Sequence, residues 1–436
     1  MKIKEYVRFD SWVLSMVLSL FYLLKYFYMK VYKNDFYALP SAGSMFRHTK
    51  FDLIRGVATK YLLRTIASHG SLKVGKELHQ IISESISDGM KEEIRSSITE
   101  EGGRPLNGRL LILSGPINDT KGVLIVKFTE SFKYLLQLFD MERLCKDYVI
   151  VVEPSYSGYF DEDILQLLCL RDPVIIETLE PVDYKFITDL ESNLLPIPLG
   201  ANHWVDDRVF HPIEGAEKIY DVIMVAIWAE FKRHYHLFEA LSKAGKEMRV
   251  ALVGKPWNKT LEDLKEEATH YGVLHMIDFF EDLSQKKINE LLNHSRCLFL
   301  LSKKEGVNKA IIEAMYADIP VFILEGFNYG FAYPFINEHT GGFINPRELA
   351  LFIRDIDDTL SRGAYSPRKW IESHISAKVS TEELVSMLHQ LEKLYSIRVN
   401  KELLVKINTP EMDYYDNKAW NTVKPSMDDM KKYLRY

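Results

Sequence analysis

Short apolar runs alternate with helical segments between residues 220 and 324, and this alternation constrains the fold more than any other feature of the chain. The apolar runs cover 220–228, 249–254, 276–280, 297–301 and 320–324. The segments between them carry apolar residues at helical spacing. Strands that alternate with helices in this way predict βαβ units and a parallel sheet. We therefore expect a doubly wound α/β domain, which binds its ligands at the carboxyl ends of its strands.

Two glutamates follow the fourth apolar run. That run ends at Ser302, Glu305 lies just beyond it, and Glu313 follows on a segment with helical spacing. A strand, a turn and a helix would bring both carboxylates to the mouth of one crevice at the carboxyl edge of the sheet. Carboxylates in such a place can accept hydrogen bonds from vicinal hydroxyls, which a sugar and a ribose offer.

The rest of the chain predicts a second domain and two appendages. At 436 residues the chain exceeds the usual size of a single core. Strand and helix patterns alternate again, less clearly, after a break at 101–105 (EGGRP). We predict a helical N-terminal extension, an N-terminal Rossmann-like acceptor domain, a C-terminal Rossmann-like donor domain and a tail, at residues 1–100, 101–212, 213–395 and 396–436.

Several landmarks in the second half resemble the retaining family-4 glycosyltransferases. In chain order they are Pro198-Leu199-Gly200 with Phe210-His211-Pro212, the loop lysine Lys232, Val253-Gly254, 302–306 (SKKEG), and Glu313-Ala314-Met315 with Pro320-Val321. Glu305 and Glu313 match the Glu-x(7)-Glu signature of that family. The resemblance implies the GT-B fold, in which two Rossmann-like doubly wound domains face a cleft and a C-terminal tail crosses back onto the first domain.

The resemblance also implies an activity. The chain would move a sugar from a nucleotide-diphosphate sugar, UDP- or GDP-linked, to a glycan or lipid-linked acceptor with retention of configuration. Glu305 would contact hydroxyls of the sugar, and Glu313 would hold the ribose. Lys232 would place a compact positive charge against the diphosphate, and Arg233 could add a forked donor. No metal or other cofactor is required on this account, because basic groups and a helix terminus replace it.

Four further positions belong to the predicted donor site. Gly306, Val307 and Asn308 precede a helix, so free backbone N–H groups there form a site for an anion. Gly306 also permits close approach of the backbone. Gly254 matches the glycine that ends the second strand of the family's donor domain.

Departures from the family pattern leave other functions open. Ala226-Ile227 stands where the family has glycine and arginine, so one phosphate contact is missing unless Arg233 replaces it. Asp318 replaces a glycine, and the glycine pair and third glutamate of many members are not recognisable in 325–335. The alternatives are a non-catalytic relative that binds a glycan or a nucleotide as a scaffold, and an epimerase or a phosphorylase of the same architecture.

Candidate acceptor-side residues follow two predicted strands of the first half. They are Ser114, Gly115, Glu153 and Ser155, and ordinary turns of small polar residues explain them equally well. Asp161-Glu162-Asp163 has the Asp-x-Asp shape of metal-dependent transferases of another fold. It precedes an apolar run, so capping of a helix explains it better than metal binding.

The N-terminal stretch 11–24 is uncharged and is followed by Lys25, Tyr26-Phe27-Tyr28 and Lys30. It is shorter than the ~20 residues that a membrane-spanning helix needs. Lysine and tyrosine beside a short apolar helix suit a membrane interface. A membrane-contacting helix at 11–30, a helix packed on the protein's own body and a true anchor all stay open.

Charge and cysteine content bound the partners and the compartment. The formal net charge of −6 and the pI near 6.1 argue against a protein that binds nucleic acid. Three widely spaced cysteines without metal-ligand spacing suit a reducing compartment. We therefore expect a cytoplasmic protein, with peripheral contact at the inner face of the cytoplasmic membrane as one option.

Overall fold

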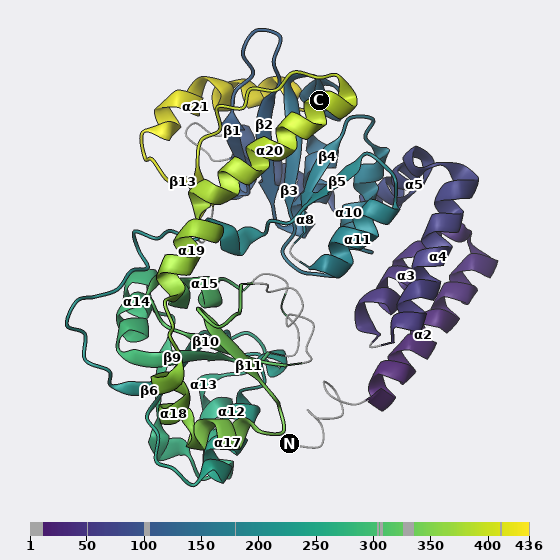
Figure 1. Cartoon of the computed structure of the whole chain (residues 1–436). Helices are drawn as coiled ribbons and strands as arrows, with labels where there is room; N and C mark the ends of the chain where they lie inside the picture. The colour runs from purple at the N-terminus through teal and green to yellow at the C-terminus, as the bar shows by residue number, and fades with distance from the viewer. Residues whose placement is uncertain are drawn as a thin grey trace. The chain divides into compact units, whose positions relative to one another are not determined.

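The chain forms two compact units in the computed structural model, which describes residues 12–49, 51–99, 105–178, 180–302, 305, 308–325, 335–409 and 412–435 (Figure 1). Unit 2 is Val205–Val379, and unit 1 combines the chain up to Trp204 with the chain from Ser380 onward. The C-terminal segment therefore returns to the first unit, as predicted. Both units contain parallel strands joined through helices, so the predicted α/β class with two Rossmann-like units is confirmed.

Unit 2 is built on a six-stranded parallel sheet with the order β11-β10-β9-β6-β7-β8. The first five strands along the chain correspond to the five apolar runs that the sequence predicted. The strands are β6 (Tyr220–Val225), β7 (Val250–Gly254), β8 (Ile277–Glu281), β9 (Ser295–Leu300), β10 (Val321–Leu324) and β11 (Gly341–Ile344).

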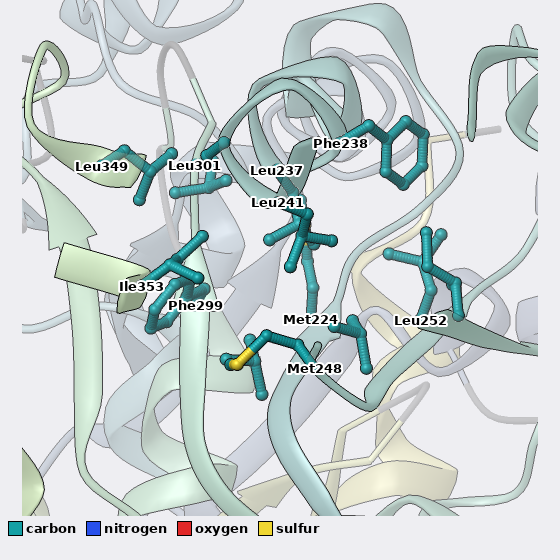
Figure 2. Packing of buried hydrophobic residues seen from close by; sticks show 14 of the residues in the cluster. Met224, Leu237, Phe238, Leu241, Met248, Leu252, Phe299, Leu301, Leu349 and Ile353 are labelled. Atoms are coloured by element: carbon teal, nitrogen blue, oxygen red, sulfur yellow. The ribbon is translucent and has the colours of Figure 1, made fainter. Parts of the chain in front are cut away.

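Helices cover this sheet and bury their apolar stripes against it. Figure 2 shows Met224 and Leu252 of the strands packed with Leu237 and Leu241 of α12 and with Ile353 of α17. Full burial of each such side chain contributes roughly 1.5–3 kcal/mol. The helices are α12 (His234–Ala244), α13 (Leu261–His270), α14 (Gln285–Asn293), α15 (Lys309–Tyr316), α17 (Leu349–Arg354), α18 (Ile356–Arg362) and α19 (Pro367–His374), with the 3-10 turns η4 (Glu230–Lys232) and η5 (Leu274–Met276).

The strand order of unit 2 reverses between β6 and β9. From β6 the chain builds outward through β7 and β8, and then continues on the other side of β6 with β9, β10 and β11. The two strands are direct neighbours, with Val222 opposite Cys297. Open α/β sheets bind ligands at such a switch point, beyond the carboxyl ends of the strands. We therefore expect a ligand-binding site in the segments that follow Val225 and Leu300.

Unit 1 contains a five-stranded sheet whose order follows the chain. β2 to β5 are parallel, but β1 runs antiparallel to β2, because a tight turn at Ile117–Thr120 joins them instead of a helix. The carboxyl end of β1 therefore lies at the amino edge of the four parallel strands. The strands are β1 (Leu110–Ser114), β2 (Gly122–Lys127), β3 (Tyr148–Glu153), β4 (Val174–Glu177) and β5 (Leu194–Ile197).

Helices and the returning C-terminal segment complete the α/β part of unit 1. The Tyr414 hydroxyl donates a hydrogen bond to the Ile112 carbonyl (2.6 Å), which fastens the segment to β1. The elements are α8 (Thr129–Leu138), α9 (Met141–Asp147), α10 (Glu162–Leu165), η2 (Gln166–Cys169), α11 (Pro181–Asp189), η3 (Ala201–Trp204), α20 (Ala377–Tyr395), β12 (Lys406–Asn408), β13 (Met412–Tyr414), α21 (Ala419–Asp428) and η6 (Asp429–Tyr433).

The predicted helical extension belongs to unit 1 and packs directly on its α/β part. A Cβ on Gly43 would come 2.4 Å from the Phe160 carbonyl oxygen, and a Cβ on Gly75 would come 2.1 Å from the Cys169 nitrogen, so only glycine allows these close approaches. Among the described residues, no helix combines the length and the apolar character that a membrane crossing requires. The helices are α2 (Trp12–Tyr32), α3 (Asp35–His48), α4 (Asp52–His69), α5 (Ser71–Ser83), α6 (Asp88–Thr99) and α7 (Pro105–Gly108).

Candidate functional site

The loop after β6 brings Lys232 to the carboxyl edge of the sheet. The loop closes with the 3-10 turn η4, in which the Lys232 N–H donates to the Ala229 carbonyl (3.0 Å). Arg233 follows with φ 56° and ψ 45°, and this left-handed conformation turns the chain sharply into α12. Because non-glycine residues rarely adopt it, the side chain of Arg233 must make contacts that hold the turn.

Those contacts are made to the backbone after β9. The Arg233 side chain is completely buried, its Nε donates to the Leu301 carbonyl (2.9 Å), and its Nη2 donates to the Ser302 carbonyl (3.3 Å). Arg233 therefore ties the end of β9 to the start of α12. The prediction that it adds a forked donor to a diphosphate is wrong for this structure, because the guanidinium is enclosed and bonds carbonyl groups of the protein.

Lys232 and Glu305 meet at the switch point. The Lys232 Nζ lies 2.5 Å from the Glu305 Oε1, and the two side chains are only 9% and 7% exposed. Lys232 follows β6 and Glu305 follows β9, so the neighbouring strands of the reversal each supply one partner. Opposite charges withdrawn from water in this way hold each other in a fixed geometry, and removal of one partner leaves a buried charge unpaired. The structure thus brings together the two residues that the sequence predicted to act on the sugar and the diphosphate.

Glu313 lies in the second turn of α15, on the helix that follows Glu305. It is 8% exposed, and its carboxylate makes no hydrogen bond or ion pair with any residue that the structure describes. Burial raises the pKa of Glu313, and the nearby Lys309 ammonium opposes this effect. A buried carboxylate normally has hydrogen-bond donors around it, so Glu313 has acceptor capacity that a ligand's hydroxyl groups can use.

The N-terminus of α15 is capped by Asn308, whose Oδ1 accepts a hydrogen bond from the Ile311 N–H (3.2 Å). Asn308 is thus positioned at the end of the helix where its dipole is positive. Gly306 and Val307, the other two predicted members of this anion site, lie outside the described residues. Their role stays a prediction.

Gly254 ends β7 and packs tightly against the loop after β6. A Cβ there would come 2.2 Å from the Ala226 carbonyl oxygen and 2.5 Å from the Trp228 Nε1. Glycine at 254 therefore makes room for the fully buried Trp228 indole, which fills the base of the β6 loop. This contact gives Gly254 a packing role, while its predicted contact with a donor stays untested.

A second buried group of charges lies beside the site and was missed by sequence reasoning. Lys259 forms a buried ion pair with Glu267, and its backbone N–H donates to the Trp228 carbonyl (3.0 Å). His234 begins α12 and is fully buried, and burial, with Lys259 and Lys232, lowers its pKa to about 3. His234 is therefore neutral near pH 7. No spacing signal links Lys259 to Lys232, since they follow different strands and only the fold brings both near His234.

Within the part of the chain that the structure describes, no group of three or more histidine, cysteine, aspartate or glutamate side chains is arranged to hold a metal ion. The positive charges beside the switch point are those of lysine and arginine side chains.

Residues 207–376 match the family model described as Glycosyl transferases group 1. Over this range the chain is similar to group 1 glycosyltransferases. The matched range covers nearly all of unit 2, including Lys232, Glu305 and Glu313, and it makes up less than half of the chain.

Solved structures of sugar-handling proteins are similar to this chain at low identity. Sucrose-phosphate synthase from Thermosynechococcus elongatus is 14% identical over 63% of this chain and 74% of its own, with a TM-score of 0.49. Anabaena HepE, in complex with UDP and glucose, is 14% identical over 61% and 78%, with a TM-score of 0.49. The pneumococcal O-GlcNAc transferase GtfA, in complex with UDP and GlcNAc, is 15% identical over 61% of this chain and 54% of its own, with a TM-score of 0.45. No curated protein sequence matches the chain.

Ser114 and Gly115, outside the range that matches the family model, do not lie at the predicted edge of the sheet. Because β1 is antiparallel, Ser114 pairs with Val123 at the start of β2, at the opposite edge from the carboxyl ends of β2 to β5. The Ser114 hydroxyl donates to the Asn400 carbonyl (2.7 Å), and the Asn400 side chain donates to the Gly115 carbonyl (2.9 Å). The two residues anchor the C-terminal segment, so their assignment to the acceptor side is wrong.

Glu153 lies at the predicted edge but is not available to an acceptor. It is 1% exposed, forms an ion pair with the buried Lys406, and accepts hydrogen bonds from the Asn408 side chain (3.0 and 3.1 Å). Burial favours protonation, yet the charges of Lys406 and Lys127 hold the pKa of Glu153 below its ordinary value. Glu153 is therefore a buried anchor for the returning segment, and the prediction of an acceptor-side role is wrong for this structure.

Glu177, which sequence reasoning missed, ends the neighbouring strand β4. The register of β3 and β4 places it beside Glu153, and it is equally buried. Burial and then the Glu153 carboxylate raise the pKa of Glu177 to about 8, so the pair holds one proton at neutral pH.

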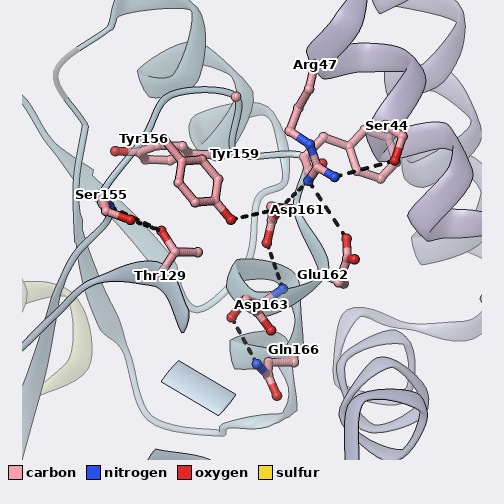
Figure 3. Close-up of polar contacts among 12 residues, drawn as sticks. Ser44, Arg47, Thr129, Ser155, Tyr156, Tyr159, Asp161, Glu162, Asp163 and Gln166 are labelled. Carbon is pink, nitrogen blue, oxygen red and sulfur yellow. Dashed lines mark hydrogen bonds and ion pairs between the residues drawn. The ribbon is translucent and has the colours of Figure 1, made fainter. Parts of the chain in front are cut away.

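Ser155 is the one predicted acceptor-side residue that is exposed at the carboxyl edge of the unit 1 sheet. Its N–H donates to the Thr129 hydroxyl (3.1 Å), and Tyr156 beside it donates to Asp161 (3.2 Å; Figure 3). Asp161 accepts from the Asp163 N–H and pairs with Arg47 of α3. It caps α10, as predicted, and joins this loop to the helical extension.

Proposed function

We propose that the chain is a retaining glycosyltransferase that moves a sugar from a nucleotide-diphosphate sugar to a glycan or lipid-linked acceptor. The observation that supports it most is the buried Lys232–Glu305 pair at the switch point of unit 2. On the next helix, the buried carboxylate of Glu313 makes no hydrogen bond or ion pair with any described residue. A nucleotide-diphosphate sugar presents a negatively charged diphosphate and pairs of hydroxyl groups, which an ammonium and two carboxylates can bind.

Donor binding would exchange the partners of this ion pair. The Lys232 ammonium would bind oxygens of the diphosphate, and the Glu305 carboxylate would then accept hydrogen bonds from hydroxyls of the sugar. Glu313 would accept hydrogen bonds from the ribose. Since the ammonium is nearly excluded from water, its attraction for a phosphate oxygen is stronger than on an open surface.

The transfer step would need no nucleophile from the protein. The bond between the anomeric carbon and the diphosphate oxygen breaks, and the acceptor oxygen bonds that carbon on the same face of the sugar. The acceptor's hydroxyl proton passes to the leaving diphosphate. Lys232 and the positive end of α15 would stabilise the charge that develops on the leaving group. We therefore expect transfer without added divalent metal, and equal rates with and without a chelator test this.

Glu305→Gln tests the catalytic role. We expect release of UDP or GDP from UDP-glucose, UDP-N-acetylglucosamine or GDP-mannose, in the presence of oligosaccharide and polyprenyl-linked acceptors, to fall by about 100-fold or more. Binding of UDP or GDP itself should not weaken, because the variant removes the charge that competes with the diphosphate for Lys232. Glu247→Gln in the same unit, whose side chain is 81% exposed, is the matched control. Equal nucleotide release by Glu305→Gln and by the wild type would remove Glu305 from the reaction.

A nucleotide-binding scaffold is the second candidate, because Ala226-Ile227 lacks the family's arginine and Arg233 does not replace it at the surface. A scaffold would bind UDP or GDP without releasing nucleotide from any donor. An epimerase would change the donor sugar without nucleotide release, and a phosphorylase would require inorganic phosphate.

A further inference from the structure

The outward face of α2 is apolar along its described length. Large apolar side chains recur on it at helical spacing, each between 53% and 75% exposed: Val17, Leu20, Phe21, Leu24, Tyr28 and Val31. None of these positions is charged, and the stripe runs for about four helical turns. A continuous exposed apolar surface of this kind marks a place where the protein binds something apolar.

The opposite face of α2 packs on the protein. Ser15, Ser19 and Tyr26 are buried, and the Tyr26 ring lies 4.5 Å from the Tyr61 ring of α4. In Figure 1, α2 lies along α3 at the start of the chain. A helix with one side fixed to protein cannot be encircled by lipid acyl chains, but it can lie along a bilayer surface with its free side in the headgroup region.

The charge of the helical extension selects one kind of surface. Residues 1–100 carry fifteen lysines and arginines against ten aspartates and glutamates, although the whole chain has a formal net charge of −6. Lys25 and Lys33 are exposed on α2 and just beyond its end. Basic residues beside an apolar helix face complement an anionic lipid surface, where each contributes about 1 kcal/mol of attraction.

The extension is joined to the candidate acceptor edge. The Arg47 guanidinium of α3 donates to the Phe160 carbonyl (3.1 Å) and forms an ion pair with Asp161. A surface bound by α2 would therefore be held in a fixed relation to the loop that carries Ser155 and Tyr156, because all these residues belong to unit 1.

We propose that unit 1 docks on an anionic lipid surface through the outward face of α2, with the helix lying along the bilayer. This docking does not rest on the proposed sugar transfer. Vesicle binding can be measured without a sugar donor, so the two proposals can fail separately. A second copy of the chain is the competing occupant of the same face.

Co-sedimentation of the full-length chain with vesicles tests the proposal. The wild type should bind vesicles of phosphatidylcholine mixed with phosphatidylglycerol, and bind pure phosphatidylcholine more weakly. The triple change Leu20→Ser, Phe21→Ser and Leu24→Ser should weaken binding by about tenfold or more. Leu394→Ser, which alters a 70% exposed residue of α20, is the matched control and should bind like the wild type.

Charge reversal gives a second readout that does not touch the apolar stripe. Lys25→Glu with Lys33→Glu should remove the preference for the anionic vesicles, and added salt should do the same in the wild type. Equal binding of the triple variant and the wild type would overturn the proposal. Equal binding of the wild type to both vesicle types would also overturn it. So would the finding that the wild type is a dimer that binds no vesicles while the triple variant is a monomer.

Discussion

The Lys232 ammonium and the Glu305 carboxylate form a buried ion pair, with Nζ 2.5 Å from Oε1, across the two strands between which the strand order of unit 2 reverses. In the absence of a ligand each charge neutralises the other. A diphosphate that bound Lys232 would therefore have to compete with Glu305, and Glu305 would become available to a sugar only after the diphosphate had bound. This exchange of partners would favour ligands that carry a diphosphate and sugar hydroxyls in one molecule.

Removal of one partner should destabilise the protein more than removal of both. Lys232→Met leaves the Glu305 carboxylate buried without a counter-charge, which should lower the free energy of unfolding by about 3 kcal/mol. In the double variant Lys232→Met with Glu305→Met the loss should be smaller, because no charge stays buried. Urea unfolding of the wild type, both single variants and the double variant gives the coupling energy. Additive losses would show that the pair is not coupled.

Glu313 should discriminate ribose hydroxyls. A hydrogen bond to a charged acceptor contributes about 1.5–3 kcal/mol, so the wild type should bind UDP or GDP at least about tenfold more tightly than the 2′,3′-dideoxy nucleotide. Glu313→Ala should bind the two nucleotides equally, and the diphosphate should still contribute to the affinity for each of them. Isothermal titration with the two nucleotides measures it. A preference that survives in Glu313→Ala would place the ribose elsewhere.

Although Arg233 and Lys232 are adjacent, their substitution should have different effects on nucleotide binding. Arg233→Met leaves the carbonyls of Leu301 and Ser302 without their donor, at about 1–3 kcal/mol each, so stability should fall. Lys232→Met should also weaken binding of UDP or GDP, whereas Arg233→Met should leave that binding unchanged. Thermal unfolding and nucleotide titration of both variants test the distinction. Loss of nucleotide affinity with unchanged stability in Arg233→Met would restore Arg233 as a phosphate ligand.

Glu177 should make stability depend on pH. Its folded-state pKa of about 8 lies above the ordinary carboxyl value of 4.5, so the unfolded chain loses this proton first as pH rises. The contribution of Glu177 therefore disfavours folding progressively between pH 4.5 and about 8. Glu177→Gln should raise the unfolding temperature at pH 8 and change it little at pH 4.5. Glu402→Gln, at an exposed position, is the control and should show no such trend.

The sequence was sufficient for five of the six strands of unit 2 and for the central pair of the site, but it did not predict β11. The strands β6 to β9 are apolar runs followed by helices, so periodicity and βα topology define the sheet edge to which Lys232 and Glu305 belong. The prediction for Glu313 followed from the same pattern, because a buried glutamate on the helix after Glu305 lies close to that edge.

Unit 1 could be predicted only in part, since its decisive contacts join distant parts of the chain. Glu153 pairs with Lys406, which is more than 250 positions away, and no local pattern distinguishes this buried anchor from an exposed acceptor group. The reversed direction of β1 had a local cause in the short turn at Ile117–Thr120, which leaves no room for a crossover helix.

In unit 2, the predicted role of Arg233 as a phosphate ligand was wrong. A basic residue in a loop is usually exposed, whereas the Arg233 side chain is buried inside a turn.

Titration of UDP and GDP against uridine and guanosine, with the wild type and Lys232→Met, tests the donor site most directly. The account predicts that the wild type binds one diphosphate at least about tenfold more tightly than its nucleoside. Lys232→Met should remove this difference and leave nucleoside affinity unchanged. A diphosphate preference that is the same in the two proteins would contradict the account.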